Sequence, residues 1–232
     1  MEPIYIIILA TIGLAVFLGI INSANTVLLD LFKKHSSTPT KSNINTISFL
    51  EGMKNLESLD YTIARTRGKL TDCYVPSKKI IALSDETFNT SSVASIAVVA
   101  HELGHAIQHK RSPLAFNLVR FVRTISSIFG SLVFPAIITA ALMFLLNINV
   151  DIAFTIFYIA LAIVASTLLS KMLTIPLEYS ASNIALDILR KYAILDEEEL
   201  QITKKITNAA AFTYVAEFIK DITGLNLFKK RS

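Results

Sequence analysis

The residues with the clearest chemical signature are His101-Glu102-Leu103-Gly104-His105. Two histidines four positions apart lie on one face of a helix, so both imidazoles can reach a single Zn²⁺ ion. Glu102 directly follows the first histidine, which is the position from which zinc peptidases take a proton from a metal-bound water. The motif predicts a Zn²⁺ site with His101 and His105 as ligands and Glu102 as the general base.

The residues around the motif favour a buried helix over the alternative, a solvent-exposed polar turn. A Thr-Ser-Ser run at 90–92 can cap a helix that covers about 93–109, and Pro113 marks its end. Residues 93–100 are almost wholly apolar, as expected of a helix that faces the protein interior. Imidazoles placed on such a helix need polar partners, and a metal ion would supply one.

A hydrolytic zinc site also needs a third protein ligand and an open position for water. His109 lies eight residues after His101, about 12 Å farther along the same straight helix, so it cannot share the ion. Glu178 is the better candidate, because it is the first carboxylate after the last apolar stretch of the chain. Pro176 comes just before it and predicts a break, with a new helix beginning near Glu178.

Three uncharged apolar stretches must position these residues, and they predict transmembrane helices. Of the 232 residues, 53% are apolar and 17% charged, a composition that disfavours an ordinary cytosolic enzyme. Residues 4–21 predict an anchor rather than a signal peptide, since no Lys or Arg precedes them. Residues 124–150 and 152–170 predict a transmembrane hairpin, with a kink at Pro135. The hairpin returns the chain to one face, where Glu178 can meet the two histidines.

The distribution of basic residues predicts the orientation of these spans. All 22 Lys and Arg residues lie between the first and second stretches or after the third. The positive-inside rule then places the N-terminus outside and the zinc site on the cytoplasmic face of a multi-pass protein of the cell membrane. The net charge of +4 therefore follows the membrane topology and does not indicate nucleic acid binding. With Cys73 as the single cysteine, no intrachain disulfide can form.

The remaining segments predict a small β-hairpin among helices. Residues 61–65 alternate between polar and apolar side chains like a further strand. Residues 70–75 and 80–83 read as the strands of the hairpin, joined by a turn that contains Pro76. The second strand could present backbone groups to an extended substrate. The predicted segments are the anchor 1–22, a linker 23–45, a cytoplasmic zinc-peptidase segment 46–123, the transmembrane hairpin 124–175, and a cytoplasmic helical segment 176–232 that carries the third ligand.

The roles of three further side chains and of one helix can each be interpreted in two ways. Tyr74 and Tyr214 could each offer a phenol to an oxyanion, although packing is the commoner role for such aromatics. Cys73 lies in the hairpin and reads as a small buried residue rather than a metal ligand. Residues 207–228 form an apolar-leaning helix that either packs on the site or lies at the membrane interface.

The chain also resembles the YugP-type membrane zinc metallopeptidases over nearly its whole length. The resemblance rests on motifs that occur in the family's order: residues 68–76 (GKLTDCYVP), Leu83-Ser84, residues 100–109 (AHELGHAIQH), the membrane hairpin, residues 176–182 (PLEYSAS) and residues 210–215 (AAFTYV). It implies a gluzincin-like zinc site, with Glu178 matching the Glu of the family's E-[FY]-x-A-S motif.

The chain departs from related patterns beside this Glu. Membrane gluzincins of the HtpX and prenyl-protein protease kind carry an acidic residue four positions later, where this chain has Ser182. Ser180 and Asn183 stand where Asp and Arg are common in YugP-like chains. These changes leave the ligand set intact and alter the groups around it.

Together these features predict a mainly α protein with a small β-hairpin and a gluzincin-like zinc site on three transmembrane helices. The predicted function is that of a zinc endopeptidase, and the rival is a non-catalytic membrane interaction or assembly protein with a structural zinc site. The expected partners are a polypeptide substrate, including membrane-associated ones, and the lipid bilayer. The sequence does not indicate the oligomeric state or the substrate.

Overall fold

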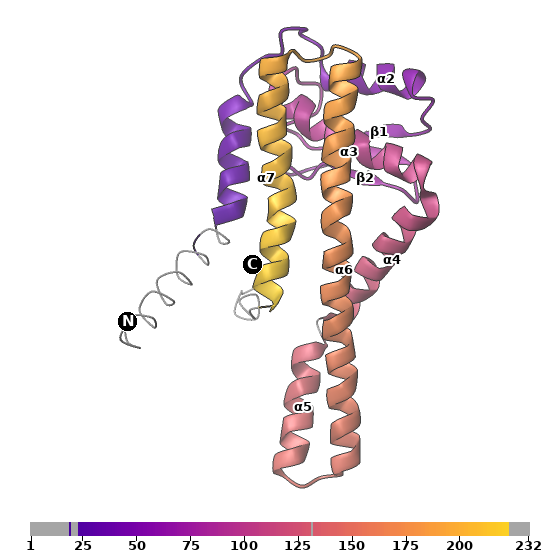
Figure 1. Ribbon diagram of the computed structural model, residues 1–232, viewed down its shortest axis with the longest axis vertical. Helices are drawn as coiled ribbons and strands as arrows, with labels where there is room; N and C mark the ends of the chain where they lie inside the picture. Colours follow the sequence, from indigo (N-terminus) through magenta and orange to yellow (C-terminus); the bar gives the residue numbers. More distant parts are fainter. Residues whose placement is uncertain (1–18, 20–22, 131, 223–232) are drawn as a thin grey trace, which may run out of the picture. The chain divides into compact units, whose positions relative to one another are not determined.

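The computed structural model describes residues 19, 23–130 and 132–222, and it shows a mainly helical chain with one small sheet (Figure 1). This confirms the predicted fold class at that level. A helix over residues 23–35 precedes the named elements. These are α2 (Thr46–Leu56), β1 (Thr62–Arg65), β2 (Cys73–Val75), β3 (Ile80–Leu83), α3 (Val93–Arg111), α4 (Pro113–Gly130), α5 (Val133–Leu145), α6 (Val150–Lys191) and α7 (Glu197–Ile222).

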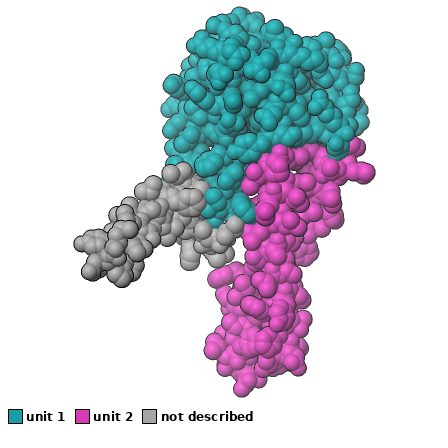
Figure 2. Space-filling view, in the orientation of Figure 1, with its two compact units in different colours: residues 1–112, 178–232 teal, residues 113–177 magenta. Residues whose placement is uncertain are grey.

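The chain forms two compact units, drawn in different colours in Figure 2. The first contains the described parts of Met1–Ser112 and Glu178–Ser232, and the second is Pro113–Leu177. Every residue of the predicted zinc site belongs to the first unit. The boundary falls inside α6, directly before Glu178.

Helix α3 is the central helix of the first unit. Ser92 caps it by accepting a hydrogen bond from the backbone N–H of Ser95, and Pro113 follows its end, as predicted. Ala94 and Ala97 form a buried cluster with Phe32 and with Ile206 of α7. The small side chains on α3 let neighbouring helices approach closely, and the burial of their apolar surface stabilises the arrangement.

The predicted linker at 23–45 is wrong for its first half, because residues 23–35 are helical. Leu28, Leu31 and Phe32 recur at helical spacing in this segment, and they pack against the cluster on α3 and α7. The segment was predicted to be a linker because polar residues follow at 36–45. Its first part is helical because the apolar stripe packs against other helices.

The sheet has three strands in the order β1-β3-β2, and these correspond to the predicted strand at 61–65 and the two strands of the predicted hairpin. Strands β2 and β3 pair antiparallel, as predicted, with Tyr74 opposite Ile81. Strand β1 pairs parallel with β3, which makes β3 the central strand. The second hairpin strand therefore has strand neighbours on both sides, and the prediction that it presents its backbone to a substrate is wrong. Strand β2 is the edge strand next to α3 (Figure 1).

The second unit contains α4, α5 and the N-terminal part of α6. Phe144 of α5 packs edge-on against Phe154 of α6, and the Ser126 hydroxyl of α4 donates to the Ser166 carbonyl of α6. The predicted hairpin turn lies between α5 and α6, where Asn147 and Asn149 have positive φ. Pro135 lies in the first turn of α5, where no intrahelical N–H is needed, and the predicted span is bent by 46° at the junction of α4 and α5 just before it.

Three transmembrane helices are not confirmed. Among the described residues, α6 alone is long and apolar enough to cross a membrane. Helices α4 and α5 meet the same criterion only as a pair, and they are bent by 46° at their junction. The predicted first span, 4–21, lies outside the described residues apart from Gly19.

The predicted helix break at Pro176 is wrong, because α6 runs without interruption through it. Proline lacks the N–H that would bond the carbonyl four residues earlier, a cost that a well-packed helix can absorb. As a result Glu178 does not open a new helix. It lies inside the helix whose first part, Ile152–Ser170, was predicted to span the membrane.

Candidate metal centre

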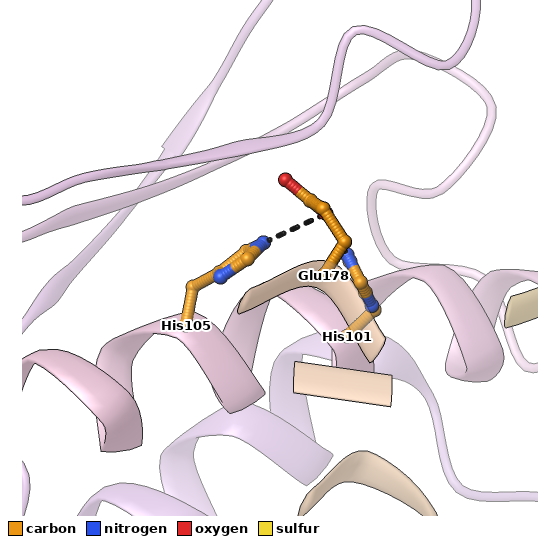
Figure 3. Close-up of side chains that lie close together, drawn as sticks. All are labelled: His101, His105 and Glu178. Carbon is orange, nitrogen blue, oxygen red and sulfur yellow. Dashed lines mark hydrogen bonds and ion pairs between the residues drawn. The ribbon is translucent and has the colours of Figure 1, made fainter. Parts of the chain in front are cut away.

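Three side chains from two helices converge on one point in the first unit (Figure 3). His101 and His105 come from α3, and Glu178 comes from α6. The Glu178 Oε2 atom lies 3.2 Å from His101 Nε2 and 3.4 Å from His105 Nε2. One nitrogen or oxygen atom from each of the three lies within 4.8 Å of the others, so the group can hold a metal ion.

These distances fit a Zn²⁺ ion. Ligand atoms at 2.0–2.1 Å from a tetrahedral zinc lie about 3.3 Å from one another. Both contacts of Glu178 match that value without rearrangement. Glu178 is 3% exposed and His101 is 9% exposed, so little water competes for the ligand atoms. Two imidazoles and one carboxylate are also a common donor set for catalytic zinc.

Hydrogen bonds to the far side of each imidazole set its orientation. The Ser182 hydroxyl donates its hydrogen to the backbone carbonyl of Glu178 at 3.0 Å. The same hydroxyl lies 3.2 Å from His101 Nδ1, and because its hydrogen is already used it accepts a hydrogen bond there. Gln108 Oε1 is an acceptor 2.9 Å from His105 Nδ1. Both Nδ1 atoms therefore carry hydrogen, and each ring meets Glu178 through its Nε2 atom. A positive charge between these nitrogens and the carboxylate, from a proton or from a metal ion, stabilises the arrangement.

The pKa values of these groups also favour a positive charge in the site. Burial raises the pKa of Glu178, but hydrogen bonds with the two histidines outweigh burial and hold this pKa well below its usual range. Burial lowers the pKa of His105, but the hydrogen bond to Glu178 together with the charges of Glu102 and Glu178 outweighs burial, so the net shift is upward. An ionised carboxylate beside two imidazoles is a suitable environment for a divalent cation.

Glu102 lies beside the three convergent groups and is not one of them. Its Oε2 atom accepts a hydrogen bond from the backbone N–H of Tyr74 in β2 at 2.7 Å. Burial raises the pKa of Glu102, and the charges of His105 and His101 partly offset this effect. A carboxylate with a raised pKa is a better proton acceptor than an ordinary glutamate, which suits a general base.

Tyr74 connects the edge strand to α3 at two points. Besides the backbone contact with Glu102, its hydroxyl lies 2.9 Å from His109 Nδ1. His109 thus interacts with the sheet, and it is not one of the convergent groups. The oxyanion roles considered for Tyr74 and for Tyr214, a partly buried residue of α7, stay predictions. Cys73 is exposed, contrary to the expectation of a buried residue.

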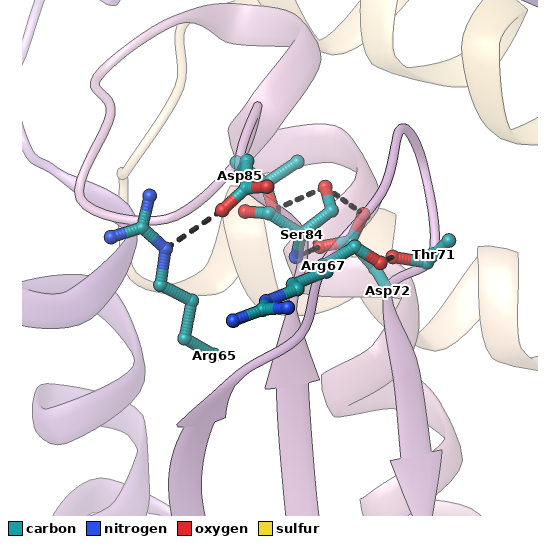
Figure 4. Close-up of polar contacts among 7 residues, drawn as sticks. Arg65, Arg67, Thr71, Asp72, Ser84 and Asp85 are labelled. Carbon is teal, nitrogen blue, oxygen red and sulfur yellow. Dashed lines mark hydrogen bonds and ion pairs between the residues drawn. The ribbon is translucent and has the colours of Figure 1, made fainter.

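Asp72 holds the edge strand in place two residues before Tyr74 (Figure 4). Its carboxylate accepts hydrogen bonds from the Ser84 backbone N–H at 2.9 Å, from the Ser84 hydroxyl at 2.8 Å, and from the Thr87 hydroxyl. In the same turn, Arg65 Nε donates to Asp85 Oδ1 at 2.8 Å. This polar cluster links β2 to the segment after β3, and so fixes the N–H that reaches Glu102.

Helices α3 and α6 make backbone contact at the centre of the site. A Cβ atom placed on Gly104 would lie 2.4 Å from the carbonyl oxygen of Ala181, closer than any real contact. Gly104 lies between His101 and His105 in the sequence, and Ala181 lies between Glu178 and Ser182. The absence of a side chain at 104 therefore sets how near the carboxylate comes to the imidazoles.

Sequence analysis named the four central residues and missed the groups that support them. Gln108 and Gly104 carried no recognised signal, although each lies within four residues of a predicted ligand. The sequence comparison noted Ser182 only as a departure from other gluzincins, and not as the partner of His101. A useful signal would have been the hydrogen-bonding capacity of residues three or four positions from each ligand.

Comparison with known proteins agrees with the zinc chemistry. The family model described as "Putative neutral zinc metallopeptidase" matches residues 6–229, so the chain belongs to this family, whose cofactor is Zn²⁺. "Putative membrane protease YugP" of Bacillus subtilis (strain 168) is 27% identical over 186 residues. The match covers 80% of this chain and 79% of that protein, and it confirms the resemblance seen in the motifs. No solved structure matches the chain.

The contact at Gly104 generates a first prediction. Gly104→Ala should lower the free energy of unfolding by about 1–3 kcal/mol, as overpacking does, and should weaken zinc binding because α6 must move away. The matched control is Gly52→Ala in α2, where an added Cβ meets nothing within 4 Å. The control should keep its zinc affinity and gain up to about 1 kcal/mol.

Thermal unfolding of the zinc-free proteins and competition with a chromophoric chelator measure the two effects separately. Equal zinc affinity in the two variants would contradict the role assigned to the contact.

Proposed function

We propose that the chain is a membrane-embedded zinc endopeptidase of the gluzincin type. His101, His105 and Glu178 are the zinc ligands, and Glu102 is the general base. The observation that carries this proposal is the distance of the Glu178 Oε2 atom from the two histidine Nε2 atoms, 3.2 and 3.4 Å, with a second acidic side chain, Glu102, beside this group but not part of it. Membership of a zinc metallopeptidase family supports the reaction class.

The chain's own residues would divide the chemistry as follows. Bound Zn²⁺ would polarise the scissile carbonyl and acidify the attacking water. Glu102 takes the proton from that water and delivers it to the nitrogen of the departing amine. The Tyr74 N–H holds one oxygen of the Glu102 carboxylate and leaves the second oxygen for the water. Ser182 and Gln108 keep the imidazoles aligned through the cycle.

The membrane placement is part of the same proposal. The relative from Bacillus subtilis is named a membrane protease, and α6 has the length and apolar composition of a span. We place the chain in the cell membrane as a multi-pass protein with its N-terminus outside and the zinc site on the cytoplasmic face. The one-sided distribution of all 22 Lys and Arg residues supports this orientation. Its substrate would be a polypeptide, including one that is membrane-associated.

The rival function is a non-catalytic membrane interaction or assembly protein with a structural zinc site. A structural site is closed by a fourth protein ligand. In the part of the chain that the structure describes, the group able to hold a metal contains three residues, which leaves a position for water. The Glu102 carboxylate bonds the edge strand and has no evident purpose in a closed site. Both observations favour the enzyme.

The ligand assignment predicts the zinc content of four variants. The purified protein should hold one Zn²⁺ per chain, and His101→Ala, His105→Ala and Glu178→Ala should each lose most of it. His109→Ala should retain the metal, because that imidazole contacts Tyr74 instead. Elemental analysis by mass spectrometry measures the content. An empty His109→Ala protein together with a full Glu178→Ala protein would overturn the assignment.

The role of Glu102 separates the enzyme from its rival. Gln at this position keeps the acceptor for the Tyr74 N–H and removes the base. Glu102→Gln should therefore keep its zinc and its folding, while hydrolysis of quenched peptide-library substrates falls by about 10²–10⁴-fold. If the purified Glu102→Gln protein hydrolyses peptides at the wild-type rate, the peptidase mechanism is wrong and the rival function stands.

The hydrogen bond between Ser182 and His101 predicts a change in affinity rather than in reaction rate alone. Ser182→Ala removes the acceptor at Nδ1 and should weaken zinc binding by about 10–100-fold. Ser180→Ala is the matched control, because Ser180 lies two residues earlier on the same helix and is exposed. Chelator competition at fixed pH measures both. An unchanged affinity in Ser182→Ala would show that the hydroxyl does not orient the ligand.

A further inference from the structure

Helix α4 carries an apolar stripe on its exposed side. Leu114, Leu118 and Phe121 are 87%, 60% and 62% exposed, and their spacing of four and three residues puts them on one face. Ile128 continues the same face and is 60% exposed. Phe116 lies on the opposite side of the helix and is buried. The helix thus presents apolar residues outwards as well as inwards, and the outer stripe needs an apolar environment.

The charged residues in this part of the chain are all positive. From Arg111 to Val150 the chain contains Arg111, Arg120 and Arg123 and no acidic residue. Arg120 and Arg123 are exposed, and at 100° per residue they lie away from the stripe formed by the apolar residues. A helix with one apolar face and a basic remainder is typical of segments that lie in the interface of an anionic bilayer. A second copy of the same basic helix would be repelled.

The place of this segment in the chain agrees with an interfacial role. Residues 113–123 precede the uncharged stretch that begins at Thr124. Helix α5, which continues that stretch, is bent by 46° from α4. Transmembrane helices tilt by up to about 40° from the membrane normal, so a tilted α5 together with the 46° bend lets α4 lie close to the membrane plane.

We propose that residues 113–123 lie along the surface of an anionic bilayer, with Leu114, Leu118 and Phe121 among the acyl chains. Arg120 and Arg123 contact the phosphate groups of anionic lipids. The inference rests on the membrane association in the proposed function, and it does not depend on zinc or on hydrolysis. Because α4 begins two residues after α3 ends, this segment ties the helix that carries His101 and His105 to the lipid surface. Such a tether would favour cleavage of chains close to the membrane.

The chain contains no tryptophan, so single tryptophans report depth without background. Leu114→Trp, Leu118→Trp and Phe121→Trp are reconstituted as full-length protein in vesicles whose acyl chains carry bromine at different depths. Glu51→Trp, on the exposed face of α2, is the aqueous control. A segment that lies in the interface gives the same shallow quenching depth at all three positions and a blue-shifted emission. The control should be unquenched.

Two other outcomes would overturn the proposal. A helix that crosses the bilayer would place positions 114 and 121 about 10 Å apart in depth, since seven residues rise by that amount. A blue-shifted emission without quenching by brominated lipid would show that protein, and not lipid, covers the stripe. Neither outcome would affect the zinc content or the effect of Glu102→Gln, so failure here is distinct from failure of the proposed function.

The lipid class is tested with the Leu118→Trp protein in mixed vesicles that contain phosphatidylcholine and phosphatidylglycerol. At equal mole fractions, brominated phosphatidylglycerol should quench several-fold more than brominated phosphatidylcholine, because the arginines enrich anionic lipid. Introducing Arg120→Gln and Arg123→Gln together into the Leu118→Trp protein should abolish the difference in quenching between the two lipids. The pair Lys204→Gln and Lys205→Gln, which removes two exposed charges from α7, should preserve it. Equal quenching by both brominated lipids in the Leu118→Trp protein with both arginines present would show that the segment does not prefer anionic lipid.

Discussion

The close crossing of α3 and α6 at Gly104 and Ala181 is the constraint on which the site depends. A hydrogen atom at position 104 lets the two backbones touch, where a Cβ atom would lie 2.4 Å from a carbonyl oxygen. His101 and His105 lie one helical turn apart on α3, on either side of Gly104 in the sequence, and Glu178 lies three residues before Ala181 on α6. The distance between the helices therefore decides whether the carboxylate can share one ion with both imidazoles. The packing of α3 against α6 therefore also determines the geometry of the metal centre.

The groups that hydrogen-bond to the Nδ1 atoms of the two imidazoles are neutral, in contrast to the acidic residue that membrane gluzincins carry at the position of Ser182. Ser182 and Gln108 accept hydrogen bonds from the imidazoles without adding negative charge. The net charge of the ligand shell is then set by Glu178, with Glu102 beside it. Neutral partners make the imidazoles less basic than an acidic partner would, so the imidazoles donate less electron density to a bound metal ion and should leave it a stronger Lewis acid.

The sheet contacts the site through its edge strand β2. Asp72 holds β2 against the segment after β3, and Tyr74 then meets α3 at both Glu102 and His109. The order β1-β3-β2 puts β2 at one edge of the sheet and β3 in its centre. The strand that contacts Glu102 is therefore an edge strand of the described sheet.

The sequence by itself determined the chemistry and the local elements. The spacing of His101, Glu102 and His105 on a helix and the β2–β3 hairpin follow from short-range patterns, which need only neighbouring residues. The tertiary structure decided the rest. Whether Pro176 breaks α6, whether residues 23–35 fold as a helix and which strand lies at the edge depend on contacts between distant segments. The order of the apolar stretches predicted that Glu178 would lie near the two histidines. The distances between them depend on the packing at Gly104, which the sequence alone does not give.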